Sequence, residues 1–332
     1  MKQAAIWLSE EDITSLVSLK DTVDALEDGV RQLGEGTGFN IPKALGSFAE
    51  ASSMHSLGSV MVQAGYCGYK NWINTPLGAK AVFILFDANE GRLLAMMEAN
   101  CLGQMRTSAM TGLGTKWVAR EGANDMAMIG TGRQALAQVA AVHLVRPLER
   151  IRIWSPTPEK RQAFCAAVAE QFDVEVVEAE SLEEATEGAP IVTTVTRARE
   201  PFLKASMLAR GAHLNAVGAI LSHSAEFEQA LFARVGFIAV DDVLNAQKGS
   251  RELIEYFDQG EGRGNWDRVR PLGQVVANHE KAPSDCDITL FKSMGMGISD
   301  LTVAIMAYQR AADAGRGKPI PLMLKAPIRW TN

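Results

Sequence analysis

Residues 126–135, which read MAMIGTGRQA, determine the fold predicted for this chain. Four apolar residues predict a buried strand, and the glycines at 130 and 132 predict a tight turn directly after it. A helix is expected from Gln134 to Leu144, and a second strand at residues 150–154, about 20 residues beyond the turn. This order of strand, helix and strand is typical of the first unit of a dinucleotide-binding sheet.

The turn also carries the expected chemistry. Gly130 allows a sharp reversal, Gly132 lets a pyrophosphate approach the backbone, and the small Ala135 allows close packing of helix on strand. The free N–H groups at the start of the helix face the phosphates. The predicted phosphate turn is therefore Gly130-Thr131-Gly132-Arg133-Gln134-Ala135. The alternative is an ordinary glycine-rich turn between a strand and a helix.

The end of the second strand predicts which dinucleotide is preferred. An acid that binds the adenine ribose of NAD is usual there, but residues 154–161 read WSPTPEKR. The hydroxyls of Ser155 and Thr157 replace the acid, and Lys160 and Arg161 follow. This composition favours a 2′-phosphate, so NADP is expected, with NAD as the alternative. Lys160 and Arg161 have a second interpretation as solvated helix residues.

The same alternation of strands and helices continues along the chain. A helix is expected at residues 158–172, and strands at residues 174–177, 191–194, 213–217 and 237–240. Alternation at this pitch predicts a parallel sheet with right-handed crossovers. The pattern breaks near residues 281–283, and a helix at about 299–312 closes the chain.

The first third of the chain has a different pattern. Ser9 is a predicted N-cap, and apolar residues recur at helical spacing from there to about Leu33. Short segments punctuated by Gly and Pro follow from 41 to 86. A buried strand at 81–86 is expected to pair with 93–97 as a hairpin, ahead of a helix at about 101–119. This part is predicted to be α+β.

Composition narrows the class of protein. A chain of 332 residues fits two domains, and 47% hydrophobic with 22% charged residues is typical of a globular protein. The net charge of −6 argues against nucleic acid as a partner, because phosphate binding needs a basic face. No apolar run approaches the roughly 20 residues that span a bilayer, and the N-terminus turns acidic. A cytoplasmic location without membrane association is expected.

The cysteines and histidines predict no metal site. Cys67, Cys101, Cys165 and Cys286 are far apart and lack C-x-x-C spacing, so reduced and mostly buried thiols are expected. Each of the five histidines stands alone, without a partner at helical spacing.

Six stretches in order along the chain resemble the ornithine cyclodeaminase/μ-crystallin family. They are 41–43 (IPK), 68–70 (GYK), 106–109 (RTSA), 130–135 (GTGRQA), 215–219 (NAVGA) and 289–293 (TLFKS). The resemblance implies a Rossmann-type, doubly wound parallel sheet inserted in an α+β substrate and dimerisation domain. The domains implied are 1–118 plus 298–332 for substrate and dimerisation, and 119–297 for the cofactor. A homodimer is likewise implied.

The resemblance also implies roles for single residues. Arg106 falls on the arginine that binds the substrate carboxylate, a task suited to a planar fork of donors. Lys43 stands where many members have a second arginine. Lys70 falls on an active-site lysine that serves as acid or base if burial lowers its pKa. The positions that line the cofactor are Arg133, Gln134, Ser155, Thr196, Val217, Gly218 and Ser293. Without the resemblance, Lys43, Lys70 and Arg106 would be interpreted as surface charges.

One position departs from the family. Cyclodeaminases and many dehydrogenases of the family have an aspartate directly after the pair that matches Gly218-Ala219, whereas this chain has Ile220 there. An isoleucine cannot accept a proton, so cyclodeamination becomes doubtful and imine reduction is favoured. His223 is a candidate proton carrier because its pKa lies near working pH, and a loop histidine facing solvent is the alternative.

These observations predict a reductase that uses NAD(P)H and acts on an imine next to a carboxylate, or on the matching amino acid in reverse. Arg106 and Lys43 would bind the carboxylate, and Lys70 or His223 would keep the nitrogen protonated. The apolar Ile220, Leu221, Trp72 and Met105 hint at a pocket less polar than one for ornithine. The alternatives are a lyase that uses bound NAD catalytically and a non-catalytic binder of nucleotide and small ligands.

Overall fold

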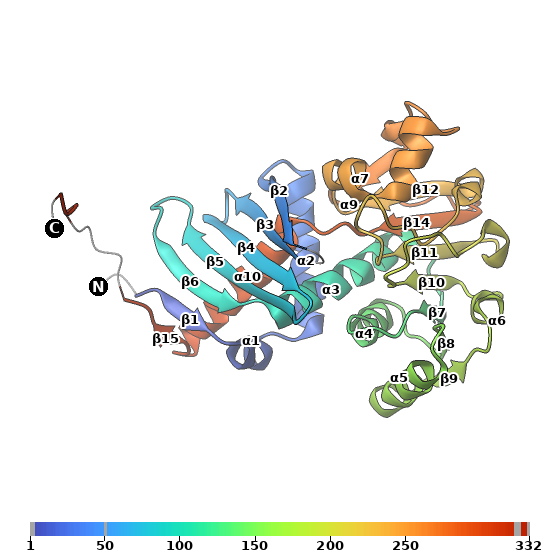
Figure 1. Ribbon diagram of the computed structural model, residues 1–332, viewed down its shortest axis with the longest axis horizontal. Helices are drawn as coiled ribbons and strands as arrows, with labels where there is room; N and C mark the ends of the chain where they lie inside the picture. Colours follow the sequence, from blue (N-terminus) through green and yellow to red (C-terminus); the bar gives the residue numbers. More distant parts are fainter. Residues whose placement is uncertain (1–3, 50–51, 322–326, 331–332) are drawn as a thin grey trace.

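The computed structural model describes residues 4–49, 52–321 and 327–330, and it forms two parts side by side, each built on its own sheet (Figure 1). Helix α3 runs from the first part toward the second, and α10 returns the chain to the first part after the second sheet is complete. The predicted α/β class with a Rossmann-type sheet inserted in an α+β part is confirmed.

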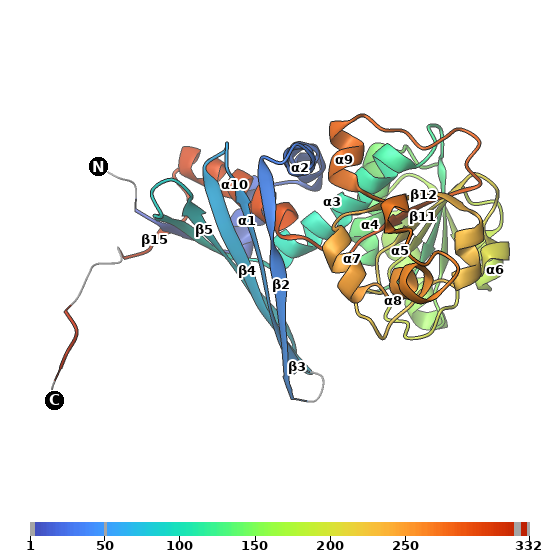
Figure 2. The ribbon, with the colours of Figure 1, turned by 90° about the horizontal axis from the view of Figure 1, so that it is seen from above.

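The first sheet has seven strands in the described residues, in the order β15-β1-β6-β5-β4-β3-β2. Neighbours pair antiparallel except β1 with β6, which are parallel. The strands are β1 (Ile6–Leu8), β2 (Gly38–Ala49), β3 (Ser52–Met61), β4 (Tyr66–Thr75), β5 (Gly78–Asp87), β6 (Leu93–Glu98) and β15 (Lys318–Pro319). Helix α10 lies along one face of this sheet, and Figure 2 shows that no helix of the described residues covers the other face.

The second sheet is parallel throughout its described strands, in the order β13-β12-β14-β11-β10-β7-β8-β9. The strands are β7 (Asp125–Ile129), β8 (Arg150–Trp154), β9 (Glu175–Glu178), β10 (Ile191–Thr194), β11 (Ala212–Ala216), β12 (Val235–Val240), β13 (Val269–Pro271) and β14 (Ile288–Lys292). The chain order reverses between β7 and β10: β8 and β9 follow β7 toward one edge, and β11 follows β10 toward the other. Ligands of such sheets bind at this reversal.

Helices connect and cover the strands. They are α1 (Glu10–Leu16), α2 (Leu19–Gly34), α3 (Asn100–Val118), α4 (Ala135–Val145), α5 (Pro158–Gln171), α6 (Leu182–Thr186), α7 (Val243–Gly249), α8 (Arg251–Ile254), α9 (Leu272–Ala277) and α10 (Gly297–Asp313). Single turns of 3₁₀-helix occupy Ala205–Met207, Gln229–Ala233 and Trp266–Arg268, and a π-helical turn occupies Glu255–Gln259.

The prediction of a single helix from Ser9 to about Leu33 is wrong, because the helix is interrupted at Val17 and Ser18. Val17 has extended backbone angles, and Ser18 begins a second capping box with Asp21, as Ser9 does with Asp12. In each box the serine hydroxyl accepts from the third helical N–H, while the aspartate accepts from the serine N–H. Two complete caps stabilise two helices instead of one.

The short segments expected between 41 and about 80 are also wrong, since β2, β3 and β4 are long strands. Pro42 interrupted the pattern, but it lies where the register of the edge strand β2 shifts between Ile41 and Ala44. A proline is tolerated there because an edge strand or bulge does not need its missing N–H. The 81–86 and 93–97 hairpin and the 101–119 helix are confirmed as β5, β6 and α3.

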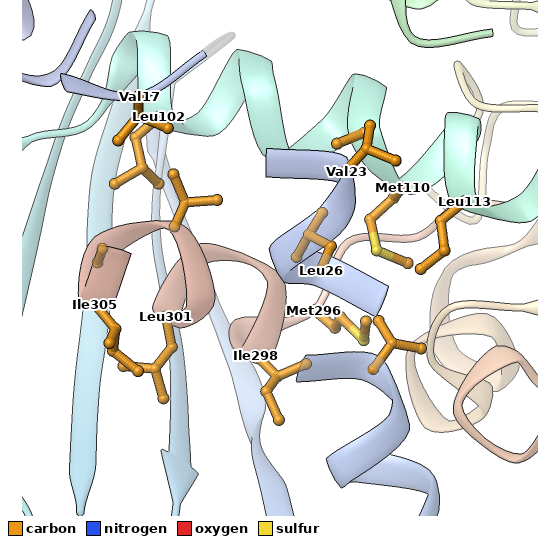
Figure 3. Packing of buried hydrophobic residues seen from close by; sticks show 14 of the residues in the cluster. Val17, Val23, Leu26, Leu102, Met110, Leu113, Met296, Ile298, Leu301 and Ile305 are labelled. Carbon is orange, nitrogen blue, oxygen red and sulfur yellow. The ribbon is translucent and has the colours of Figure 1, made fainter. Parts of the chain in front are cut away.

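A continuous apolar core joins α2, α3 and α10 beneath the first sheet (Figure 3). Leu26 of α2, Met110 of α3 and Leu301 of α10 are fully buried. Burying each such side chain contributes about 1.5–3 kcal/mol. The core therefore fixes α3 and α10 against each other, and these two helices carry site residues described below.

Two further expectations concern the thiols and the membrane. All four cysteines are free, but Cys286 is the buried one, and Cys67, Cys101 and Cys165 are half-buried rather than mostly buried. Among the helices of the described residues, none is long and apolar enough to cross a bilayer.

Candidate active site between the two sheets

A cavity of about 1240 Å³ opens between the two parts of the chain. It is lined by residues of β4, β5 and α3 from the first part, and by residues at the ends of β7, β8, β10, β11 and β14 from the second. Most of the predicted site residues line it: Lys70, Arg106, Gly130, Thr131, Gly132, Arg133, Gln134, Ser155, Thr157, Thr196, Val217, Gly218 and Ser293. Lys43, Arg161 and His223 are not among the lining residues.

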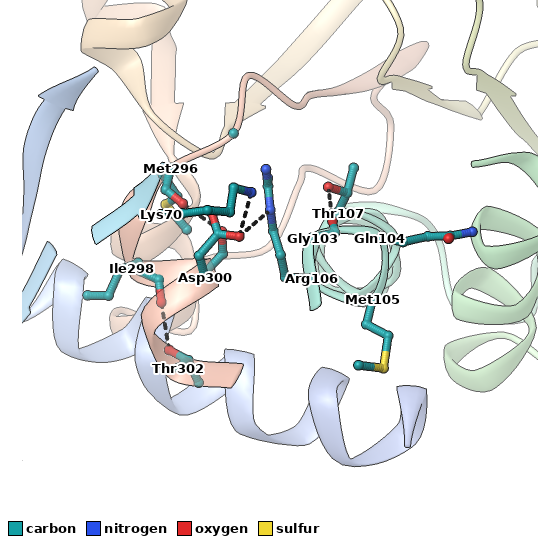
Figure 4. Close-up of polar contacts among 12 residues, drawn as sticks. Lys70, Gly103, Gln104, Met105, Arg106, Thr107, Met296, Ile298, Asp300 and Thr302 are labelled. Atoms are coloured by element: carbon teal, nitrogen blue, oxygen red, sulfur yellow. Dashed lines mark hydrogen bonds and ion pairs between the residues drawn. The ribbon is translucent and has the colours of Figure 1, made fainter. Parts of the chain in front are cut away.

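Lys70 and Arg106 both contact one buried carboxylate, that of Asp300. The Lys70 ammonium donates to Asp300 Oδ1 at 2.7 Å, and Arg106 Nε donates to the same oxygen at 3.1 Å. Figure 4 shows Lys70 from β4, Arg106 from α3 and Asp300 from α10 converging on this point. Because Asp300 takes the Nε of Arg106, the two terminal nitrogens, which have no hydrogen-bond partner in the described residues, are left to a ligand.

The surroundings of Lys70 lower the pKa of its ammonium group. Burial, and after it the neighbouring Arg106, lower its pKa to about 8, although Asp300 opposes this shift. The Lys70 ammonium also lies 5.1 Å from the centre of the Trp72 ring, which favours the charged form. A lysine whose pKa is about 8 can donate and accept a proton near neutral pH.

Asp300 is a residue that the sequence reasoning missed. Its side chain is fully buried in the first turn of α10, and its Oδ2 is buried without a hydrogen-bond partner in the described part of the chain. A lone acid in the apolar helix sequence GISDLTVAIMA was the available signal. An acid in such a position is almost always paired, but its partners lie far away in the sequence.

Lys43 lies near this cluster but not at the cavity wall. Its ammonium is 5.8 Å from the centre of the Trp72 ring, and its pKa is lowered by burial and then by Arg106. His55 stacks on Trp72, with ring centres 4.5 Å apart. Burial lowers the pKa of His55 to about 4, so the stack is neutral and Trp72 presents an aromatic wall to the cavity.

The phosphate turn has the geometry that a dinucleotide requires. Gly130 has φ of +107°, and a Cβ there would lie 2.8 Å from the Val195 carbonyl oxygen. At Gly132 an added Cβ would meet nothing within 4 Å, so the space beside the backbone is open. In the described residues no side chain caps the N-terminus of α4. The Ala135 N–H donates to the Gly132 carbonyl at 2.9 Å, and the other N–H groups of the first turn are left for an anion. The Gln104 amide donates to the Arg133 carbonyl at 2.9 Å and ties the turn to α3.

At the end of β8, the hydroxyls of Thr131 and Ser155 lie 3.3 Å apart, and Ser155 is buried. Arg161 does not reach the cavity, because its Nε donates to Glu178 at 2.9 Å and one terminal nitrogen donates to the Ser155 carbonyl at 3.1 Å. Lys160 is exposed and lines the cavity. Lys160, rather than Arg161, is the cation facing this end.

The loop after β11 separates two predicted residues. Ile220 lines the cavity with 38% of its surface exposed. His223 is exposed and lies outside the cavity wall, which favours the interpretation of a loop histidine facing solvent. Ser293, after β14, is buried and donates to Asp241 at 3.1 Å.

Comparisons with known proteins all lead to one protein family. A family model described as the ornithine cyclodeaminase/mu-crystallin family matches residues 4–315. A Delta(1)-pyrroline-2-carboxylate reductase of Bacillus cereus is 32% identical over 252 residues, which cover 74% of this chain and 77% of that protein. The ketimine reductase mu-crystallin of Rattus norvegicus is 32% identical over 244 residues, 73% of this chain and 72% of that protein.

Solved structures match over the whole fold. The Delta(1)-pyrroline-2-carboxylate reductase of Thermococcus litoralis, in complex with NADH and L-proline, has a TM-score of 0.88 and 27% identity, covering 95% of this chain and 100% of that chain. An archaeal alanine dehydrogenase dimer with bound NAD has a TM-score of 0.88 and 25% identity, covering 97% and 100%.

Proposed function

The chain belongs to the ornithine cyclodeaminase/mu-crystallin family, and we propose that it is an NAD(P)H-dependent reductase of an imine adjacent to a carboxylate. The observation that carries this proposal is the cluster of Lys70 and Arg106 on Asp300, at the wall of a cavity that continues to the phosphate turn. One end of the cavity thus suits a carboxylate and a protonated nitrogen, and the other suits a dinucleotide.

The residues present fit a dinucleotide. The open space at Gly132 and the uncapped start of α4 suit the pyrophosphate, and the residues after β10, β11 and β14 suit the nicotinamide end. When bound, the reduced nicotinamide would supply the hydride that reaches the imine carbon. The protein supplies orientation and charge around that carbon.

Arg106 binds the substrate carboxylate in this proposal. Its Nε is held by Asp300, so the two terminal nitrogens present a fixed fork, and the side chain is only 11% exposed. A charged fork in a buried setting gives strong and well-oriented hydrogen bonds to a carboxylate. Lys43 supports the site through its positive charge near Trp72 and does not contact the substrate directly.

Lys70 keeps the imine nitrogen protonated, which makes the adjacent carbon electrophilic. It is favoured over His223 because it is buried at the cavity wall, whereas His223 is exposed outside it. In the direction of amino-acid oxidation the neutral form of Lys70 accepts the proton instead. The pKa of about 8 makes both forms accessible.

The substrate is proposed to be a cyclic or small open-chain imine with an apolar side chain. Trp72 and Ile220 line the cavity, and neither supplies a carboxylate that would form an ion pair with a second amino group such as that of ornithine. Pyrroline-2-carboxylate, piperideine-2-carboxylate, and pyruvate with ammonia or methylamine are the compounds to test first.

The test follows the absorbance of NADPH, and separately of NADH, during incubation of the protein with each compound of this panel. We expect oxidation of the cofactor with at least one cyclic imine. Turnover of ornithine with no net change in absorbance would instead identify a lyase. Dinucleotide binding without turnover of any compound would identify a non-catalytic binder.

A preference for NADPH over NADH is part of the proposal. Ser155, rather than an acid, directly follows β8, and Lys160 lines the cavity at this end. Arg161 is already engaged by Glu178, so Lys160 with the hydroxyls of Ser155 and Thr157 would hold a 2′-phosphate. Equal catalytic efficiency with NADPH and NADH would contradict this preference.

The domain division and the homodimer are also proposals. Residues 1–118 plus 298–332 would form the substrate and dimerisation domain, and 119–297 the cofactor domain.

The face of the first sheet that α10 leaves open exposes Phe39, Met54, Tyr69 and Ile73. We propose that a second copy covers this face, as large exposed apolar patches mark interfaces. Light scattering of the protein and of Ile73→Lys tests it, with a monomeric wild type as the contrary result.

A cytoplasmic location completes the proposal. It rests on the four free cysteines, since reduced thiols are typical of that compartment. Cell fractionation with an antibody to the protein tests it.

A further inference from the structure

Glu226 is a fully buried carboxylate that receives four hydrogen bonds from two loops. The N–H and the hydroxyl of Thr196, after β10, donate to Oε1 at 2.7 and 2.8 Å. The N–H groups of Gly218 and Ala219, after β11, donate to Oε2 at 2.8 and 3.2 Å. One side chain therefore joins the ends of two adjacent strands.

These two loops belong to the cavity wall. Thr196 and Gly218 line the cavity, whereas Glu226 does not. A Cβ added at Gly218 would collide with the backbone of Thr196 and with Glu226, so the loops are in close contact. The carboxyl ends of parallel strands are where ligands of such sheets bind, so the position of these loops sets the shape of the site.

Glu226 is itself held in place by a second buried acid. Its N–H donates to Glu252 at 3.0 Å, and Glu252 lies 3.6 Å from the Lys292 ammonium. Lys292 also donates to the Ala219 carbonyl and directly precedes Ser293 at the cavity. All three charged side chains are buried, so the loops after β10, β11 and β14 share one network of charges and hydrogen bonds.

We propose that Glu226 is a positioning residue for the nicotinamide half of the cofactor site. It would act through Thr196 and Gly218, without contacting the cofactor. The same anchor fixes the start of the loop that presents Ile220 to the cavity. The phosphate turn at Gly130 and Gly132 lies between β7 and α4 and makes no hydrogen bond to Glu226 in the described residues, so the adenine half should be independent of it. This inference rests on the proposed function.

The experiment compares Glu226→Gln with the unaltered protein and with Glu228→Gln, a matched control two residues along the chain. Calorimetry measures the Kd of NADPH and of 2′-phospho-ADP-ribose, which lacks the nicotinamide. We expect Glu226→Gln to weaken NADPH by about 10-fold and to leave the fragment within about 2-fold, because an amide cannot accept from all four donors. Glu226→Asp should retain part of the affinity, and Glu228→Gln all of it.

Hydrogen exchange in the protein without cofactor gives a second readout. The amides of Thr196, Gly218 and Ala219 should exchange faster in Glu226→Gln, while those of α4 should not change. Equal weakening of NADPH and the fragment, or unchanged exchange at the three amides, would overturn the proposal. If the unaltered protein binds no dinucleotide, the proposed function fails, and the exchange experiment still decides whether Glu226 orders these loops.

Discussion

The Lys70 ammonium lies 2.7 Å from the Asp300 carboxylate, and both side chains are buried although 230 residues separate them in the sequence. The contact joins β4 to α10 and holds Lys70, whose pKa is lowered, at the cavity wall. It supplies an acid close to the site although Ile220 replaces the aspartate common in the family. Asp300 is not among the residues that line the cavity, so in the proposed function it would act through Lys70 and Arg106.

The first prediction concerns pH. The proposed function requires protonated Lys70 for imine reduction, so kcat/KM should be level below its pKa of about 8 and fall as pH rises through it. Amino-acid oxidation needs the neutral form and should rise through the same pH. Asp300→Asn removes the charge that favours the ammonium, so the descending limb should move to lower pH. Rate profiles in both directions measure this, and a limb unchanged in Asp300→Asn would contradict it.

The second prediction concerns Arg106. Replacing it by alanine should lower kcat/KM by about 10²- to 10³-fold, because a charged and oriented pair of hydrogen bonds to the carboxylate is lost. Arg106→Lys keeps the charge without the fork and should lose less. Steady-state kinetics with the best imine of the panel measure both variants. A loss confined to cofactor binding would contradict the assigned role.

The third prediction separates two glycines of the phosphate turn. Gly132→Ala should leave the melting temperature unchanged, since its Cβ meets open space, yet weaken dinucleotide binding by about 10-fold or more. Gly130→Ala should destabilise the protein itself by about 1–3 kcal/mol, because φ is +107° and the Cβ approaches the Val195 carbonyl. Thermal unfolding with and without NADPH distinguishes the two effects.

The fourth prediction concerns stability. Arg146 donates to the carbonyls of Thr115, Lys116, Ala119 and Arg120 at distances of 3.1 to 3.3 Å and so satisfies the end of α3. Arg146→Ala should lower the free energy of unfolding by about 2–4 kcal/mol, because buried carbonyls lose their donor. Arg150→Ala, which removes more exposed ion pairs, should cost less than about 1 kcal/mol. Equal losses in denaturant unfolding would contradict this explanation.

Local patterns located six of the eight described strands of the parallel sheet, β7 to β12, but missed β13 and β14. The strands expected at 150–154 and 191–194 agree with β8 and β10 residue for residue, because each strand-turn-helix unit is specified by neighbouring residues. The antiparallel strands β2, β3 and β4 were missed. They mix glycine, proline and polar residues, and their pairing depends on partners in other strands.

The residues of the candidate site also fall into those that the sequence could locate and those that it could not. The turn at 130–135 could be located from spacing, and Lys70 and Arg106 from resemblance, although the roles of all three stay predictions. Asp300 and Glu226 could not be assigned, because their function lies in contacts with residues distant in sequence or across loops. Both would have been interpreted as ordinary acids.

The position of α10 after β14 in the chain has a consequence for protein synthesis. Translation releases Lys70 and Arg106 early, then every strand of the parallel sheet, and only afterwards Asp300. Folding units generally form in the order in which they emerge. A growing chain could therefore assemble its nucleotide half on the ribosome while its two site cations still lack their counter-ion, so the substrate half is the last to mature.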